Sequence, residues 1–253
     1  MKDIVLNEAE RGAELLRAGR GLEDLRASIS LVARYDVQAA GIAFEEAVRH
    51  VADYAKKAFP EVHPSHIDGI VPHYVRQAEK YPLSRIAYVP ITEAELVAIG
   101  DFEDRKVRCL AFSALALAKY DTMRFEGVDY WIRGDRWGEV MRRANVEVPK
   151  AELGKFLHTL YAAGLLGASQ RVGNCSIRVQ FADVDGEPIL RLTDPDFKDL
   201  GYAYRAYEGE PFRRCAECGR WIRQAKNGRK KYCDNCSATQ HNRAALASYH
   251  RKK

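Results

Sequence analysis

The residues best suited to chemistry are four cysteines near the end of the chain, arranged as two C-x-x-C pairs. Cys215-Ala-Glu-Cys218 and Cys233-Asp-Asn-Cys236 are separated by fourteen residues. Tetrahedral zinc takes four thiolates, and each C-x-x-C turn supplies two of them, so this spacing is typical of a structural zinc site. Neither pair opens the helix of a βαβ unit, which disfavours a redox-active C-x-x-C. We therefore expect these four cysteines to bind one structural Zn²⁺ ion.

Positive charge is concentrated in the same segment. Residues 211–253 contain twelve Lys and Arg against two acids, a net charge of +10, whereas residues 1–210 carry a net charge of −5. A basic segment attached to a mildly acidic body predicts a contact with nucleic acid, while a solvated basic end that aids solubility is the alternative. The candidate contacts in this segment are Arg220, Arg223, Arg229, Lys230, Lys231, Arg243 and Arg251.

The elements around the cysteines can also be predicted. We expect short strands at residues 220–223 and 229–232 around a turn at 226–228, and an Ala-rich helix after Cys236. A knuckle, a hairpin and a helix that carries the second ligand pair resemble the treble-clef family of zinc fingers, over about residues 212–250. Many members of that family bind nucleic acid and some dock on proteins. Trp221 and Tyr232 alternate with cations and could stack on bases, although we expect Trp221 to pack internally.

The middle of the chain carries a second pattern. We expect a helix from Asp104, a helix-turn-helix over residues 135–163, and a strand at 176–181 paired with 165–170. This order resembles the winged-helix variant of the helix-turn-helix fold, over about residues 104–182. The resemblance implies that the helix at 149–163 reads the major groove and that the hairpin touches the DNA backbone. The residues it nominates for DNA contact are Lys150, Lys155, His158, Arg171 and Arg178. Winged helices also serve as protein-docking modules, so this alternative stays open.

The remaining sequence defines the organisation but names no chemistry. The fold class we expect is mainly α with small β. It comprises a helical N-terminal region (1–100), a central winged helix-turn-helix domain (104–193), an aromatic connector (194–211) and a basic treble-clef finger (212–253). We expect the connector to pack against the winged helix, with freedom only around residues 208–211. His63, His66 and His73 lie close together, but no further ligand completes a metal site with them.

Several function classes are disfavoured. The chain has no phosphate-binding loop, dinucleotide-binding glycine motif, H-E-x-x-H or G-x-S-x-G, so we do not expect an enzyme. Asp183, Asp185 and Glu187 could hold Mg²⁺ in a nuclease, but a solvated acidic turn is the simpler interpretation. The charged start of the chain and the absence of a long apolar run predict a cytoplasmic protein that does not enter membranes.

The order of the modules is similar to that of uncharacterised proteins of phages and integrated elements in Gram-positive bacteria. That resemblance implies transcription or replication control of a mobile element. The leading hypothesis is a sequence-specific binder of duplex DNA. Two alternatives remain: an adaptor or inhibitor that uses the winged helix as a protein-docking surface, and a binder of RNA or single strands through the finger. The sequence leaves open whether the protein is a monomer or a homodimer.

Overall fold

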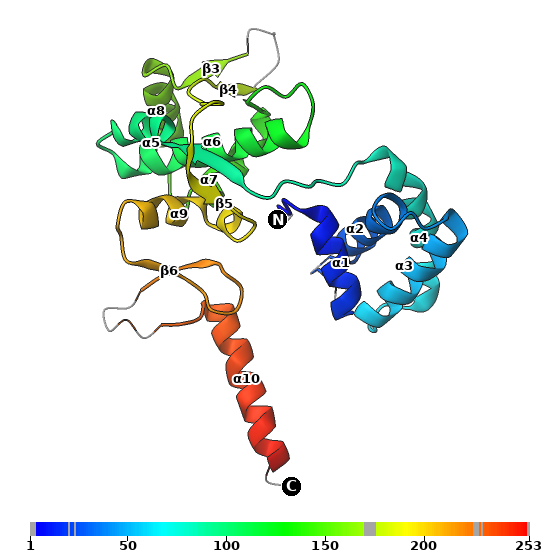
Figure 1. Ribbon diagram of the computed structural model, residues 1–253. Coiled ribbons are helices and arrows are strands. Elements are labelled where there is room, and N and C mark those ends of the chain that lie inside the picture. Colours follow the sequence, from blue (N-terminus) through cyan, green and yellow to red (C-terminus); the bar gives the residue numbers. More distant parts are fainter. Residues whose placement is uncertain are drawn as a thin grey trace. The chain divides into compact units, whose positions relative to one another are not determined.

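The computed structural model describes residues 4–19, 21, 22, 24–169, 176–224, 228 and 230–251, without the side chains of residues 150, 151 and 243–251. The chain divides into two compact units, Val5–Ala87 and Tyr88–Lys253, and the latter also includes Met1–Ile4. Each unit is described by itself. The expected fold class, mainly α with small antiparallel sheets, is confirmed (Figure 1).

The first unit is a bundle of four helices. They are α1 (Glu8–Ala18), α2 (Leu25–Gln38), α3 (Phe44–Ala58) and α4 (Pro64–Gln77), followed by the 3₁₀ turn η1 (Ala78–Lys80). Asn7 caps α1 by accepting a hydrogen bond from the backbone N–H of Glu10 at 3.1 Å. Ile29, Val51 and Ile67 are fully buried in the core between the helices. The apolar faces of these amphipathic helices therefore account for the bundle.

The second unit is built around α6 (Arg105–Arg124), whose residues from Cys109 to Lys119 are all buried. The other elements before the cysteines are β1 (Val89–Thr92), α5 (Glu93–Gly100), β2 (Trp131–Ile132), η2 (Gly134–Arg136), α7 (Trp137–Arg143), α8 (Lys150–Ala162), β3 (Leu166–Ala168), β4 (Ile177–Val179), β5 (Pro188–Leu192), η3 (Asp196–Lys198) and α9 (Leu200–Tyr207). Tyr204 of α9 packs its ring on Phe112 of α6, with 5.1 Å between the ring centroids. A helix buried on all sides explains why the run from Val107 to Ala118 is so apolar.

Two small antiparallel sheets flank α6. In one, β2, β4 and β3 lie in that order, and Gly167 of β3 is opposite Arg178 of β4. The predicted strand at 176–181 is confirmed over Ile177–Val179, where burial alternates: Ile177 and Val179 are buried, and Arg178 is only partly buried. The tip of this hairpin lies outside the described residues. In the other sheet β1 pairs with β5, so that Val89 is opposite Leu192.

The pairing of β1 with β5 moves a boundary that the sequence suggested. The helical N-terminal region was expected to reach residue 100, but the first unit ends at Ala87. Val89 and Ile91 of β1, and Ile99 of α5, are fully buried within the second unit. These residues therefore belong to the second unit because their apolar side chains complete its core.

The cysteine-containing segment, here called the finger, spans residues 212–251. It consists of β6 (Phe212–Arg214), β7 (Trp221–Arg223) and α10 (Asp234–Arg251). β7 pairs with β6, with Arg213 opposite Ile222. The expected strand at 229–232 is wrong for the described residues 230–232, which are not in a strand. The reason is that the first C-x-x-C turn itself closes the hairpin, so β7 takes its partner from the preceding segment.

The connector also differs from expectation around residues 208–211. Arg205 donates two hydrogen bonds to Glu210, at 2.9 and 2.6 Å, and Arg108 of α6 pairs with Glu208 at 2.9 Å. These ion pairs are less than a quarter exposed, so they hold the segment that was expected to be free. None of the helices within the described ranges is both long and apolar enough to cross a bilayer.

Candidate metal centre and nucleic-acid interface

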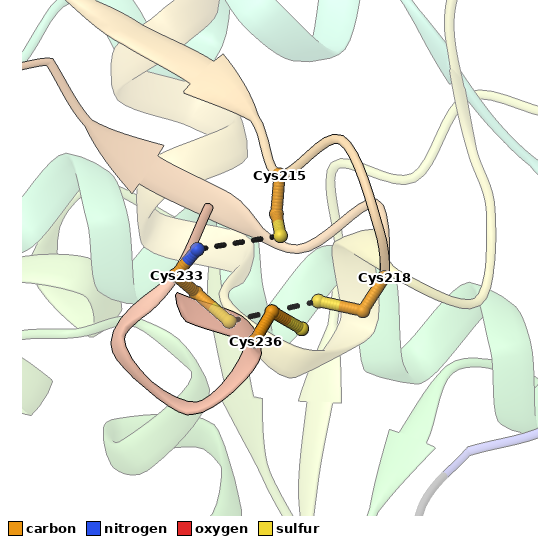
Figure 2. A group of neighbouring side chains, drawn as sticks. All are labelled: Cys215, Cys218, Cys233 and Cys236. Atoms are coloured by element: carbon orange, nitrogen blue, oxygen red, sulfur yellow. Dashed lines mark hydrogen bonds between the residues drawn. The ribbon is translucent and has the colours of Figure 1, made fainter. Parts of the chain in front are cut away.

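The four cysteines meet at the junction of the β6–β7 hairpin and the start of α10 (Figure 2). Cys215 and Cys218 lie in the hairpin turn, Cys233 immediately precedes α10, and Cys236 lies in its first turn. All four Sγ atoms lie within 4.8 Å of one another, and those of Cys218 and Cys233 are 3.8 Å apart. This cluster could hold a metal ion, as the sequence predicted.

Backbone hydrogen bonds fix the turn of the first cysteine pair and link it to the second pair. Gly219 has φ +68°, a left-handed conformation that glycine adopts without strain, and its N–H donates to the carbonyl of Cys215 at 3.0 Å. The N–H of Cys233 donates to the sulfur of Cys215 at 3.3 Å. The second pair is thereby held against the first by a backbone hydrogen bond. The sulfurs of Cys218 and Cys233 are also within hydrogen-bonding distance of each other.

The four sulfurs differ in their electrostatics. Burial raises the pKa of the Cys215 thiol, but backbone N–H groups of Cys218, Cys233 and Glu217 outweigh it and lower that pKa to about 6. Burial and the neighbouring sulfurs raise the pKa values of Cys218 and Cys236. The cluster therefore stabilises the Cys215 thiolate and opposes ionisation of Cys218 and Cys236, a conflict that a bound cation relieves.

Two buried aspartates anchor the finger, and sequence reasoning missed them. Asp196 and Asp199, in and directly after η3, are each 1% exposed. Asp196 accepts from Nε1 of Trp221 at 2.7 Å and pairs with Arg214 at 2.6 Å, and Asp199 receives two hydrogen bonds from the guanidinium of Arg220. No local pattern in the sequence could have paired these carboxylates with partners fifteen or more residues away.

This anchoring changes the roles of two predicted contact residues. Arg220 was expected to bind nucleic acid, but its guanidinium bonds to Asp199, which raises the pKa of Arg220. Trp221 packs internally, as expected, with the Arg214 guanidinium 4.3 Å above its ring. The structure therefore gives Arg220 and Trp221 an intramolecular role.

The other nominated residues fall into three groups. Lys155, His158, Arg223 and Lys231 are exposed. Arg178 pairs with Asp129 in a pair that is half exposed, and Lys230 pairs with Asp234 at 2.8 Å on the surface. Arg171 and Arg229 lie outside the described residues, as do the side chains of Lys150, Arg243 and Arg251.

The structure brings two of these residues together. Lys155 and His158 are three residues apart on α8, and both are exposed together with Thr159. Leu160 is the one fully buried side chain among those described in α8. One side of α8 is therefore open to a partner, while Leu160 holds the helix to the unit.

The acidic turn at residues 183–187, which was considered as a Mg²⁺ site, is held by hydrogen bonds within the protein. The Asp183 carboxylate accepts hydrogen bonds from the backbone N–H groups of Asp185 and Gly186, both at 3.2 Å, and the Asp183 carbonyl accepts from Lys119 at 3.0 Å.

In the N-terminal unit, the ring of His63 accepts from the backbone N–H of Ser65 and so caps α4. Within the part of the chain that the structure describes, the cysteine cluster is the group of metal-ligating side chains that comes together.

Comparisons with models of protein families, with curated proteins and with solved structures give no match to this chain. The inferences below therefore rest on its own residues and geometry.

Proposed function

We propose that the protein binds duplex DNA in a sequence-specific manner, using α8 to read bases and the finger to contact phosphates. The order α6, β2, α7, α8, β3, β4 with the sheet order β2-β4-β3 supports a winged-helix domain. In that family the helix equivalent to α8 enters the major groove and the β3–β4 hairpin lies over the backbone. A transcription or replication role in a mobile element rests on the resemblance of the module order alone.

The observation that carries this proposal is the open face of α8. Lys155, His158 and Thr159 are exposed on α8, a 13-residue helix that is the second helix of the proposed helix-turn-helix. Amino, imidazole and hydroxyl groups can all bond to base edges or phosphates. This face has little charge, so phosphate contacts from the finger would supply most of the affinity.

We further propose that the metal is zinc. In a tetrahedral site with Zn–S bonds of about 2.3 Å, neighbouring sulfurs are about 3.8 Å apart, which matches the 3.8 Å between the sulfurs of Cys218 and Cys233. Cys215, Cys218, Cys233 and Cys236 would supply all four ligands. Such a closed site leaves no position for a substrate, so the ion would stabilise the finger rather than catalyse a reaction.

The proposal is tested with zinc-loaded full-length protein and labelled duplexes. Selection from a random-sequence duplex library should enrich a defined site, and Lys155→Glu should abolish the preference for it. Lys80→Glu is the matched control, because Lys80 is exposed in the N-terminal unit and the change in charge is the same. Absence of binding to any duplex at low salt would refute the proposal and favour the protein-docking alternative.

A preference for unpaired RNA or DNA would support the single-strand alternative instead. Of the aromatic side chains described in the finger, Trp221 donates to Asp196 and Phe212 is stacked on Tyr202 with 4.8 Å between the centroids, which leaves Tyr232 for base stacking. Stacking on aromatic side chains is a main source of affinity for single strands. The duplex is therefore the partner that we favour.

A further inference from the structure

Residues 196–201 lie between the finger and the turn that joins α7 to α8. On the finger side, Asp199 receives two hydrogen bonds from Arg220. On the other side, the same carboxylate accepts a hydrogen bond from Nδ2 of Asn145 at 3.0 Å. Asn145 has φ +53° and follows Ala144, the residue that caps the end of α7. One buried carboxylate therefore bonds both to the finger and to the helix-turn-helix.

Two further contacts make this junction tight. A Cβ atom added at Gly201 would lie 1.7 Å from the carbonyl oxygen of Ala144, so the start of α9 touches the end of α7 directly. Arg143, whose side chain is 1% exposed, donates to the carbonyl of Phe197. Packing this close transmits a displacement of residues 196–201 to residues 143–145.

The charges show that the cations at this junction come from the finger. Asp196 and Asp199 are almost completely buried, and a buried carboxylate needs a cation or several donors. The cations facing them are Arg214 and Arg220, both from the finger, whereas the donors from outside the finger, Asn145 on Asp199 and Thr193 on Asp196, are neutral. Arg143 is paired with Glu139 at 2.7 Å. The charge balance of Asp196 and Asp199 thus depends on a folded finger.

The finger in turn depends on its metal. Within its described residues, the buried side chains are Phe212, Cys215 and Ile222. So small a core cannot hold a fold without the ion. Loss of the ion therefore frees Arg214 and Arg220 from the two aspartates.

We infer that the four-cysteine site regulates the reading helix: metal bound to the finger holds Asp199 on Asn145 and so fixes the α7–α8 turn that positions α8. Release of the metal leaves Asp196 and Asp199 without cations, and the segment 196–201 separates from the turn to hydrate them. The consequence for DNA rests on the function proposed above, whereas the coupling between the metal and the turn does not.

The test is hydrogen exchange of the full-length protein with zinc and after removal of zinc by a chelator. Exchange should become faster in the finger and also at residues 143–147, while α3 of the N-terminal unit stays unchanged as the internal control. Faster exchange in the finger with no change at 143–147 would overturn the inference, and so would a purified protein that takes up no zinc.

A variant separates this coupling from general unfolding. Arg220→Gln keeps all four cysteines, so it should still bind one zinc ion. Loss of a charge-assisted hydrogen bond should speed exchange at residues 143–147 by about tenfold or more. Arg223→Gln is the matched control, because Arg223 is exposed in the neighbouring strand and has no ion-pair partner among the described residues. Equal exchange at 143–147 in the two variants would refute the coupling.

These readouts need no DNA, so the two proposals can fail separately. Coupling without duplex binding would refute the proposed function and leave the metal-dependent turn intact. If the protein binds duplex DNA, the chelator should weaken selection of the preferred site. Unchanged selection after zinc removal would overturn the regulatory inference alone.

Discussion

The arginines and lysines of the finger divide into anchoring and free cations, and this division predicts how binding responds to salt. Arg214 and Arg220 face buried aspartates, whereas Arg223 and Lys231 are exposed and have no ion-pair partner within the described residues. Each phosphate contact contributes about 0.9 to the slope of log affinity against log salt. If Arg223 and Lys231 each contact one phosphate, Arg223→Gln with Lys231→Gln should lower the slope by about 1.8.

That change is large enough to measure by fluorescence anisotropy on a random-sequence duplex. Between about 50 and 200 mM salt, the affinity ratio of wild type to the double variant should shrink about tenfold. Arg220→Gln serves as the comparison, because it removes one positive charge from a residue that is bonded to Asp199. It should lower the stability of the finger and leave the slope unchanged. Equal slopes in wild type and in the double variant would refute the assignment of Arg223 and Lys231 as phosphate contacts.

Three further predictions concern stability. Gly201→Ala should destabilise the second unit by about 3 kcal/mol or more, because its Cβ would lie 1.7 Å from the Ala144 carbonyl oxygen. Lys119→Ala should cost about 3–5 kcal/mol, because it leaves the fully buried Glu95 carboxylate without its cation at 2.6 Å. Burial raises the pKa of Asp36, although the His50 partner opposes this, so the folded state holds the proton more tightly than the unfolded state. Wild type should therefore gain stability relative to Asp36→Asn as the pH falls from 7 toward the pKa of Asp36 in the folded state. The free energy of unfolding in urea measures all three effects.

Each of these predictions has its own control. Gly138→Ala lies in α7 where an added Cβ meets nothing within 4 Å, so a loss of stability as large as at Gly201 would contradict the steric argument. Lys119→Met combined with Glu95→Gln removes both charges, and it should cost less than Lys119→Ala alone. A constant difference between wild type and Asp36→Asn across the pH range would show that Asp36 has the same pKa in both states.

The sequence predicted best what local chemistry determines. The two C-x-x-C pairs and the strand at β4 each depend on residues a few positions apart, and the structure agrees with both predictions. Burial on alternate sides acts within one strand, so a strand can be identified from the spacing of its residues alone.

The failures concern partners that are distant in sequence. The four residues of β1 carry no strong strand signal of their own, and β1 is defined by its pairing with β5. Asp196 and Asp199 look like ordinary turn residues in the sequence, and their role comes from the ion pairs with Arg214 and Arg220. The hairpin error has the same origin, since β7 could pair with the segment on either side of it. Such choices are made by tertiary packing, which the local propensity of a short strand does not reveal.

The pairing of β1 with β5 also has a consequence for synthesis of the chain. Val89 cannot meet Leu192 until roughly a hundred further residues have left the ribosome, and long-range pairing of this kind slows folding. The bundle from Val5 to Ala87 makes its contacts within itself and can fold as soon as it emerges. During translation the nascent chain therefore carries a finished helical bundle ahead of an open β-strand edge, and β5 covers that edge when it arrives.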